Sequence, residues 1–268
     1  MQLGISSYTY TWSIGVPGSL PDRQMSATDL VDRAAAFGLK LVQIADNLPL
    51  GNFTDAELEN LCQYAFKKGV SIEMGGRGLT PEHTLRCLNV AEKLHSPILR
   101  MVIDDRGFEP DIPSIIQIIR DLLPEFESRK IKLAIENHDR LKAREFEHIV
   151  LATNYDWVGI CLDSVNSMGA GEGFETVAEI LIPYTINLHL KDFTIQRVSH
   201  KMGILIEGTP AGTGMLNIPA LIEKLNQTGR CEHAILELWT PPEPDLPDTI
   251  AKEIDWANRS VEYLRKIF

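Results

Sequence analysis

The sequence predicts a closed parallel (β/α)₈ barrel, a TIM barrel, that spans residues 1–268 as a single domain. Eight short apolar runs alternate with longer amphipathic runs, and no linker of distinct composition separates them. The polar residues of the short runs also share one parity, as expected when one face of each strand lines a barrel interior. The length fits, because α/β barrels commonly use about 200 to 250 residues as one domain. An open doubly wound sheet is the alternative.

The short apolar runs are the expected strands. Each has the length of a buried strand and is followed by a helix-like segment, which is the order of a parallel sheet with crossover helices. The expected strands lie near residues 2–8, 40–46, 70–75, 98–104, 131–137, 157–163, 185–191 and 233–239.

The amphipathic runs are the expected helices. Asn217 can cap a helix whose apolar face repeats at residues 218, 221, 222 and 225, and Gly229 follows as a stop signal. Pro81 can occupy the first position of another helix, where its missing N–H removes no hydrogen bond. The other helices are expected near residues 26–37, 55–68, 112–128, 144–153, 173–182 and 249–266.

One connection is longer than a typical barrel loop. The stretch Phe193–Gly214 follows the seventh expected strand and precedes the helix capped by Asn217. Because long connections in compact domains usually carry structure or function of their own, we expect a lid or a hairpin here.

Strand parity predicts where the ionisable side chains gather. In the seventh strand, Asn187, His189 and Lys191 occupy one face and Ile186, Leu188 and Leu190 the other. The fourth, fifth and sixth strands alternate in the same way, with Arg100, Glu136 and Asp163 on the polar face. We therefore expect the ionisable groups inside the barrel near the C-terminal strand ends, where barrel active sites are built.

Composition excludes several functional classes. With 26 Lys and Arg against 37 Asp and Glu, the net charge of −11 argues against a general nucleic-acid binder. The four cysteines form no C-x-x-C pair and are expected to be reduced and buried. No run has the length of a signal peptide or a membrane span, so a cytoplasmic protein without membrane partners is expected.

Four consecutive strands end in a possible metal ligand: Glu136, Asp163, His189 and Glu237. In an eight-stranded barrel, inward glutamates on the fifth and eighth strands leave a gap of about 5 Å, which one cation nearly fills. Three carboxylates with one imidazole favour Mn²⁺, and Mg²⁺, Co²⁺ or Zn²⁺ are also compatible. A single acidic residue at a strand end is more often a loop or cap residue, but four on adjacent strands favour a metal site.

These residues carry a family resemblance. The segments Glu136-Asn137-His138, Cys161-Leu162-Asp163-Ser164, Leu188-His189-Leu190-Lys191-Asp192 and Ile235-Leu236-Glu237-Leu238 resemble the metal-site motifs of the xylose isomerase-like TIM barrel superfamily, in particular its sugar phosphate isomerase/epimerase branch. The resemblance implies a divalent-metal sugar isomerase or epimerase in which Glu136 and Glu237 exchange protons with the substrate through a metal-stabilised enediolate.

Other functions remain open within that resemblance. The runner-up is a metal-dependent dehydratase or lyase that acts on a keto-sugar, a keto-cyclitol or a dehydroshikimate-like substrate. A noncatalytic carbohydrate-binding barrel and an endonuclease IV-like enzyme are less favoured. Barrels of this family commonly form dimers or tetramers, so a homodimer or homotetramer is expected.

Several residues are candidates for substrate binding. The family usually places a histidine three residues after the sixth-strand aspartate, where this chain has Asn166, and an arginine after the seventh-strand histidine, for which Arg197 is the nearest candidate. The expected set is Tyr8, Trp12, His138, Asn166, Lys191, Arg197 and Trp239.

Two glycine-rich segments follow the third and sixth strands. Gly75-Gly76-Arg77-Gly78 and Gly169–Gly173 match neither a Walker motif nor a dinucleotide fingerprint. No nucleotide cofactor is therefore expected, and tight turning or binding of a small anion by backbone N–H groups explains the glycines.

Overall fold

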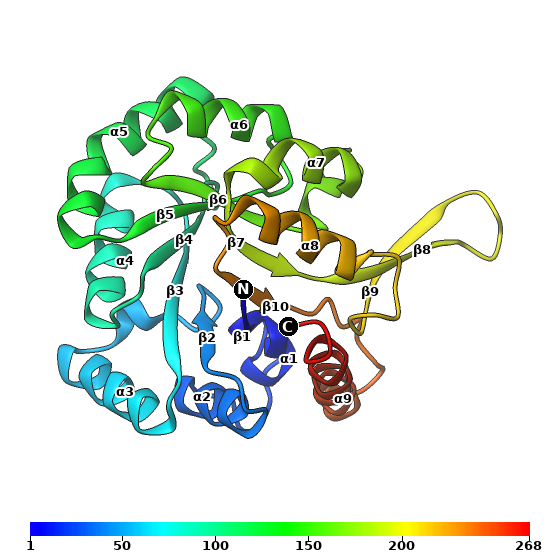
Figure 1. Ribbon diagram of the computed structural model, residues 1–268. Coiled ribbons are helices and arrows are strands. Elements are labelled where there is room, and N and C mark those ends of the chain that lie inside the picture. The colour runs from blue at the N-terminus through cyan, green and yellow to red at the C-terminus, as the bar shows by residue number, and fades with distance from the viewer.

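Eight parallel strands close into a barrel in the computed structural model, which describes residues 1–268 (Figure 1). Strand β1 pairs in parallel with both β2 and β10, which closes the sheet on itself. The predicted TIM barrel is confirmed, and the open sheet is excluded. The barrel strands are β1 (Gln2–Ser6), β2 (Leu41–Ile44), β3 (Ser71–Arg77), β4 (Ile98–Val102), β5 (Lys132–Glu136), β6 (Val158–Asp163), β7 (Thr185–Leu190) and β10 (His233–Leu236).

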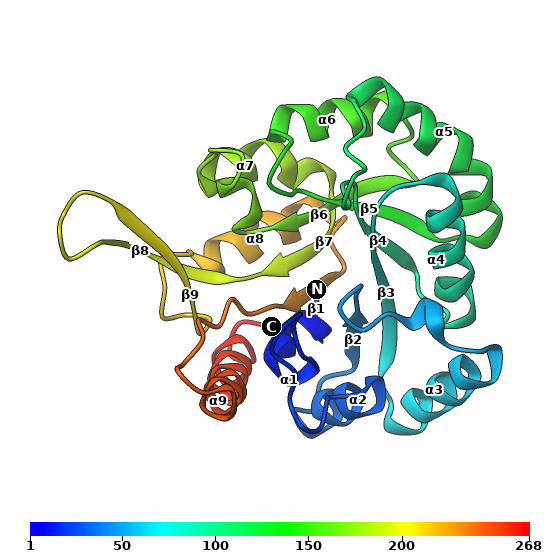
Figure 2. The ribbon, with the colours of Figure 1, turned by 180° about the vertical axis from the view of Figure 1, so that it is seen from behind.

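Helices surround the barrel, as both ribbon views show (Figure 2). The expected end signals are present in α8: Asn217 accepts a hydrogen bond from the Ala220 N–H, and Gly229 ends the helix in the left-handed conformation. No helix is long and apolar enough to cross a membrane. The helices are α1 (Thr11–Ile14), α2 (Ala27–Ala36), α3 (Asp55–Lys68), α4 (Pro81–Lys93), α5 (Ile112–Arg129), α6 (Ala143–Ala152), α7 (Phe174–Leu181), α8 (Ile218–Thr228) and α9 (Leu246–Leu264); short 3₁₀ turns are η1 (Ser7–Tyr10), η2 (Leu50–Asn52), η3 (Asn166–Met168) and η4 (Ile182–Tyr184).

The main apolar core is large, but the barrel interior has only a small apolar cluster of Ile98, Ala134, Cys161 and Ile186. The position of Ile186 corrects the parity prediction, which placed this side chain on the helix-facing side. The β6–β7 pairing shifts register between Ile160 and Cys161, so Ile186 turns inward. A side chain at Gly159 would have its Cβ 2.6 Å from Ile186 Cγ2, and glycine therefore makes room for the inward isoleucine.

The long connection after β7 is a two-stranded antiparallel hairpin of β8 (Asp192–Arg197) and β9 (Ile204–Thr209), which projects from the barrel (Figures 1 and 2). The carboxylate of Asp192 fixes its base by accepting four backbone N–H groups, from residues 193, 212, 214 and 216. At Gly208 the hairpin approaches Trp239 so closely that an added Cβ would lie 2.2 Å from the Trp239 carbonyl oxygen.

A buried carboxyl on α9 holds the segment after β1. Glu253 accepts hydrogen bonds from the Trp12 N–H at 2.8 Å, the Ser13 N–H at 2.9 Å and the Ser13 hydroxyl at 2.7 Å. Burial raises the pKa of Glu253 to about 7, although these hydrogen bonds act in the opposite direction. The native state consequently holds this proton at pH values where an unfolded glutamate has lost it.

Stability is therefore expected to fall as the pH rises from about 4.5 to above 7, because the folded protein must then ionise a buried carboxyl. Glu253→Gln keeps the volume and one of the two acceptor oxygens; whatever its effect on overall stability, it should reduce this pH-dependent loss by up to about 3 kcal/mol. Urea unfolding at a series of pH values measures the difference, with the exposed Glu262→Gln on the same helix as control. Parallel pH profiles for wild type and Glu253→Gln would contradict the assignment.

Candidate active site and metal centre

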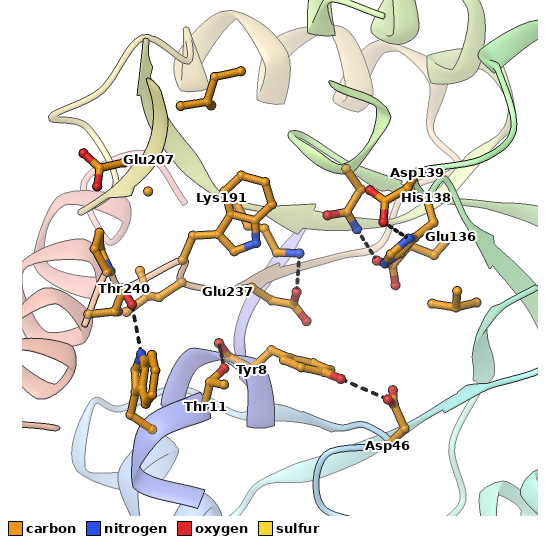
Figure 3. Close-up of a pocket in the computed structure, with 18 of the residues that line it drawn as sticks. Tyr8, Thr11, Asp46, Glu136, His138, Asp139, Lys191, Glu207, Glu237 and Thr240 are labelled. Carbon is orange, nitrogen blue, oxygen red and sulfur yellow. Dashed lines mark hydrogen bonds and ion pairs between the residues drawn. The ribbon is translucent and has the colours of Figure 1, made fainter. Parts of the chain in front are cut away.

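A pocket of about 610 Å³ lies at the C-terminal ends of the barrel strands (Figure 3). Its walls come from the segment after β1, the ends of β3 to β5, the loop after β7, strand β9 and the segment after β10. Because parallel strands all end at this side of the barrel, residues far apart in sequence meet here. The lining residues include Tyr8, Trp12, Asp46, Arg77, Arg100, Glu136, His138, Asn166, Lys191, Glu237 and Trp239.

The four side chains predicted as metal ligands meet at the floor of this pocket. The Nδ1 atom of His189 lies 3.4 Å from Glu136 Oε2, 3.4 Å from Glu237 Oε1 and 3.9 Å from Asp163 Oδ2. All four residues are almost completely buried. The imidazole is therefore the common neighbour of three carboxylates that come from three different strands.

The residues present fit a divalent cation. His189 Nδ1, Glu136 Oε2 and Asp163 Oδ2 are buried and lack a well-aligned hydrogen-bond partner, although cationic side chains lie near both carboxylates. Two groups of potential ligand atoms lie within 4.8 Å of one another, and both contain His189: one adds Asp163 and Glu237, the other Glu136 and Cys161. Carboxylate oxygens with one imidazole nitrogen suit Mn²⁺, Mg²⁺, Co²⁺ or Zn²⁺.

The ammonium of Lys191 stands between two of the carboxylates. Its Nζ lies 2.9 Å from Glu237 Oε2 (Figure 3). It also lies 2.7 Å from Asp163 Oδ2, so Lys191 neutralises part of the negative charge of the cluster. Burial lowers the pKa of Lys191, but the charges of Asp163 and Glu237 outweigh burial and raise it above its usual value. Lys191 is therefore a permanent cation at the pocket floor.

Arg100 neutralises part of the negative charge of Glu136. Its guanidinium is almost fully buried, with Nε 3.1 Å from Glu136 Oε2, and it donates a hydrogen bond to the Gly76 carbonyl. Burial raises the pKa of Glu136, but the charges of Arg100 and His189 hold that pKa well below its usual value. Burial also raises the pKa of Glu237, but the charges of His189 and Lys191 outweigh burial and lower it. Both glutamates are thus carboxylates at neutral pH.

Arg77 and His138 form the side of the pocket nearest β3 and β5. Arg77 Nη2 donates to His138 Nε2 at 3.0 Å, and His138 Nδ1 lies 3.1 Å from Asp139. Asp46 lies close by, with Oδ2 3.6 Å from Arg77 Nε, and accepts a hydrogen bond from the Tyr8 hydroxyl. Since arginine can only donate, His138 must carry its proton on Nδ1 when it is neutral.

Most predicted substrate-binding residues line the pocket. Asn166 donates to Glu136 Oε1 at 2.8 Å, and the indole of Trp12 donates to the Thr240 carbonyl at 2.8 Å. Trp239 is partly exposed at the edge where the hairpin crosses. Tyr8, His138 and Lys191 also lie on the wall, so six of the seven meet in one cavity.

Arg197 is the exception, since the structure does not bring it to the pocket. It ends β8 near the tip of the hairpin, is exposed and donates to the Lys201 carbonyl. The family resemblance favoured a pocket position because the family's arginine follows the seventh strand. The structure instead shows the alternative, an exposed loop charge, because the hairpin carries residue 197 away from the barrel.

Three wall residues received no functional role from the sequence: Asp46, Arg77 and Arg100. The inward parity of Arg100 on the fourth strand indicates that its side chain faces the barrel interior. Arg77 lies in a glycine-rich segment for which the sequence suggests a tight turn or an anion site formed by backbone N–H groups, and Asp46 lies at the end of the second expected strand. Their parity or strand-end position could have marked all three, but only the closed barrel brings them together.

The closed barrel and the buried cluster of potential metal ligands fit one family of TIM barrels, and sequence comparison agrees. A model of the xylose isomerase-like TIM barrel family matches residues 31–266, and the chain belongs to this family. The family membership expected from the motifs is confirmed.

Individual relatives differ in what their names describe. The 3-oxo-isoapionate decarboxylase of Pectobacterium atrosepticum is 31% identical over 98% of this chain and 95% of its own length. The D-psicose 3-epimerase of Clostridium cellulolyticum H10, solved with D-tagatose, has a TM-score of 0.76 at 13% identity, covering 100% of this chain and 99% of that one. The IOLI protein, solved with a zinc atom, has a TM-score of 0.70 at 16% identity over 100% of this chain and 99% of that one. The two structures support the fold.

Proposed function

We propose that this chain is a divalent-cation-dependent lyase that decarboxylates a small polyhydroxylated β-keto acid. The observation that carries the proposal is that Arg77 has no close carboxylate partner in the pocket. Arg100 and Lys191 each contact a carboxylate within 3.1 Å, whereas the nearest carboxylate oxygen to Arg77 is 3.6 Å away. One-third of the Arg77 side chain is exposed in the pocket. A carboxylate of the substrate would complete its pairing.

The relationship to a decarboxylase over almost the full length of both chains supports the same reaction. A neutral sugar has no charged group that could pair with the Arg77 guanidinium, whereas a sugar acid has a carboxylate. The lyase class, which the sequence ranked second, is therefore placed first, with decarboxylation in place of water loss.

Different residues of the site have different roles in this reaction. Glu136, Asp163, His189 and Glu237 would hold the cation, which supplies positive charge beside the substrate oxygens. When the carbon–carboxylate bond breaks, carbon dioxide leaves and the bonding electrons pass to the keto oxygen. Arg77 orients the carboxylate before it leaves. A proton must then reach the carbon; a water molecule in the open pocket supplies it and leaves as hydroxide, and we assign the positioning of that water to the Glu237 carboxylate, whose Oε2 lies 2.9 Å from Lys191 Nζ.

Sugar isomerisation or epimerisation is the second candidate. The supporting observation is that Glu136 on β5 and Glu237 just after β10 both lie 3.4 Å from His189 Nδ1. Two carboxylates around one centre can act as a pair, one removing a proton next to a carbonyl and the other returning it. The same residues thus serve either reaction, and the substrate decides between them.

Product analysis separates these activities. Purified protein with added Mn²⁺ would be incubated with a branched β-keto sugar acid and, separately, with a panel of ketoses. Release of carbon dioxide from the acid supports decarboxylation, whereas NMR detection of an epimer or isomer from a ketose supports the second candidate. Loss of water by mass would instead identify a dehydratase, and binding without conversion a carbohydrate-binding barrel; either result would overturn the proposal.

Replacing Arg77 tests the assigned substrate contact. Arg77→Met is expected to raise KM for the acid substrate about 10- to 100-fold, because one charge-assisted pair is lost. The KM of any neutral ketose should change little. Steady-state kinetics measure both, and the exposed Arg106→Met serves as control for the loss of one positive charge. An equal loss for acid and neutral substrates would contradict a carboxylate contact.

A further inference from the structure

A series of buried, hydrogen-bonded polar side chains lies inside the barrel, beneath the ligand cluster of Glu136, Asp163, His189 and Glu237. His189 Nε2 lies 2.6 Å from Gln43 Oε1, and Gln43 Nε2 lies 3.0 Å from Glu73 Oε2. Each of these three side chains is completely buried. They come from β7, β2 and β3, and the series connects the ligand cluster to the N-terminal end of the barrel.

The far end of this series is fixed by Glu73. Three donors surround its carboxylate: His233 Nδ1 at 2.5 Å, Gln43 Nε2 at 3.0 Å and Asn187 Nδ2 at 3.2 Å. A carboxylate can only accept hydrogen bonds. Buried polar groups without partners are costly, so the amide group of Gln43 must turn its NH₂ toward Glu73.

This orientation determines the proton on His189. With its NH₂ committed to Glu73, Gln43 presents its oxygen to His189 Nε2, and an amide oxygen can only accept. The proton of the neutral imidazole therefore sits on Nε2. The lone pair then sits on Nδ1, the nitrogen that faces Glu136, Asp163 and Glu237 and has no hydrogen-bond partner of its own.

We propose that Glu73, acting through Gln43, is a positioning residue that sets the tautomer of His189 and so makes Nδ1 the metal-binding nitrogen. The inference rests on the proposed cation site only at its last step, since the tautomer exists whether or not a cation is bound. If the Gln43 amide were reversed, its NH₂ could donate to an unprotonated His189 Nε2. The same reversal would place the Gln43 oxygen against the Glu73 carboxylate with no proton between the two oxygens.

The test uses isosteric exchanges. Glu73→Gln removes the fixed acceptor while keeping the volume, so both orientations of Gln43 become possible and a mixture of His189 tautomers is expected. The double variant Glu73→Gln/Gln43→Glu exchanges carboxylate and amide, and the carboxylate introduced at position 43 would again accept from His189 Nε2. The pure tautomer should return in the double variant. Glu232→Gln, exposed and next to His233 in sequence, is the control.

Two readouts follow the effect. NMR of nitrogen-labelled histidine in the metal-free protein, at alkaline pH where His189 is neutral, reports the tautomer; its signal is assigned by loss in His189→Gln. Titration with Mn²⁺ reports the dissociation constant, which should rise about 10- to 100-fold in Glu73→Gln and recover in the double variant. Thermal unfolding of each variant confirms that the barrel is folded.

Distinct results overturn distinct claims. A wild-type His189 protonated on Nδ1, or a Glu73→Gln protein that keeps the pure Nε2–H tautomer, would overturn the role of Glu73. A purely structural role would alter unfolding in both variants and leave the tautomer unchanged, which also overturns it. Absence of Mn²⁺ binding by wild type would overturn the proposed cation site, while the tautomer measurement would still decide the role of Glu73.

Discussion

Glu136→Gln and Glu237→Gln should each lower turnover by about 10²- to 10⁴-fold while the barrel remains folded. Each substitution removes a carboxylate that can ligate a cation and move a proton, but keeps the side-chain volume. Although burial raises them, the neighbouring cations hold the pKa values of both glutamates below the usual one, so both side chains are ionised in the native protein, whereas glutamine carries no charge. Steady-state assay of the activity found for the wild type measures the loss.

The two variants should differ in stability. Glu136→Gln leaves the buried Arg100 with the 3.6 Å contact to Asp46 as its one ion pair, whereas Glu237→Gln leaves Lys191 its 2.7 Å partner Asp163. A buried charge that loses its partner is costly, so Glu136→Gln should unfold at lower temperature. The exposed Glu223→Gln on α8 is the control for both. Full activity in both site variants would refute the assignment of these glutamates.

Removal of divalent cations is expected to abolish turnover and to lower the unfolding temperature. Three buried carboxylates converge on His189, and a cation among them relieves their mutual repulsion. A ligand bound only by the folded state stabilises it by about 2.7 kcal/mol at one hundred times its dissociation constant. Dialysis against a chelator, followed by thermal unfolding and assay with Mn²⁺, Mg²⁺, Co²⁺ or Zn²⁺ restored in turn, measures both effects.

A ligand variant provides the control for cation binding. Asp163→Asn should unfold at the same temperature with and without added Mn²⁺, because one ligand charge is lost. Undiminished turnover in protein from which mass spectrometry detects no metal would contradict the cation site.

The fold was predictable because periodicity is a local property of the chain. Each expected strand corresponds to an observed one, and the segment 55–68 is a helix with the expected bounds. Parity failed at Ile186 for a physical reason: the register shift beside Cys161 depends on the pairing of two strands, and no pattern within the strand 185–191 records it.

The site was predictable where function follows strand position and unpredictable where it follows three-dimensional proximity. Glu136 and His189 are marked by their inward parity at strand ends. The contact of Arg77 with His138 joins residues 61 positions apart, and only closure of the barrel creates it. Arg197 shows the converse, because nearness in sequence to His189 did not keep it near in space.

The anchoring of the hairpin by Asp192 has an evolutionary consequence. One carboxylate gathers four backbone N–H groups from both sides of the insertion, so the two ends of the hairpin are tied together at the barrel wall. The tip beyond this anchor can lengthen, shorten or change sequence without displacing His189 or Lys191. Substitutions or length changes in the hairpin tip can therefore alter the rim of the pocket while the buried side chains at its floor stay in place.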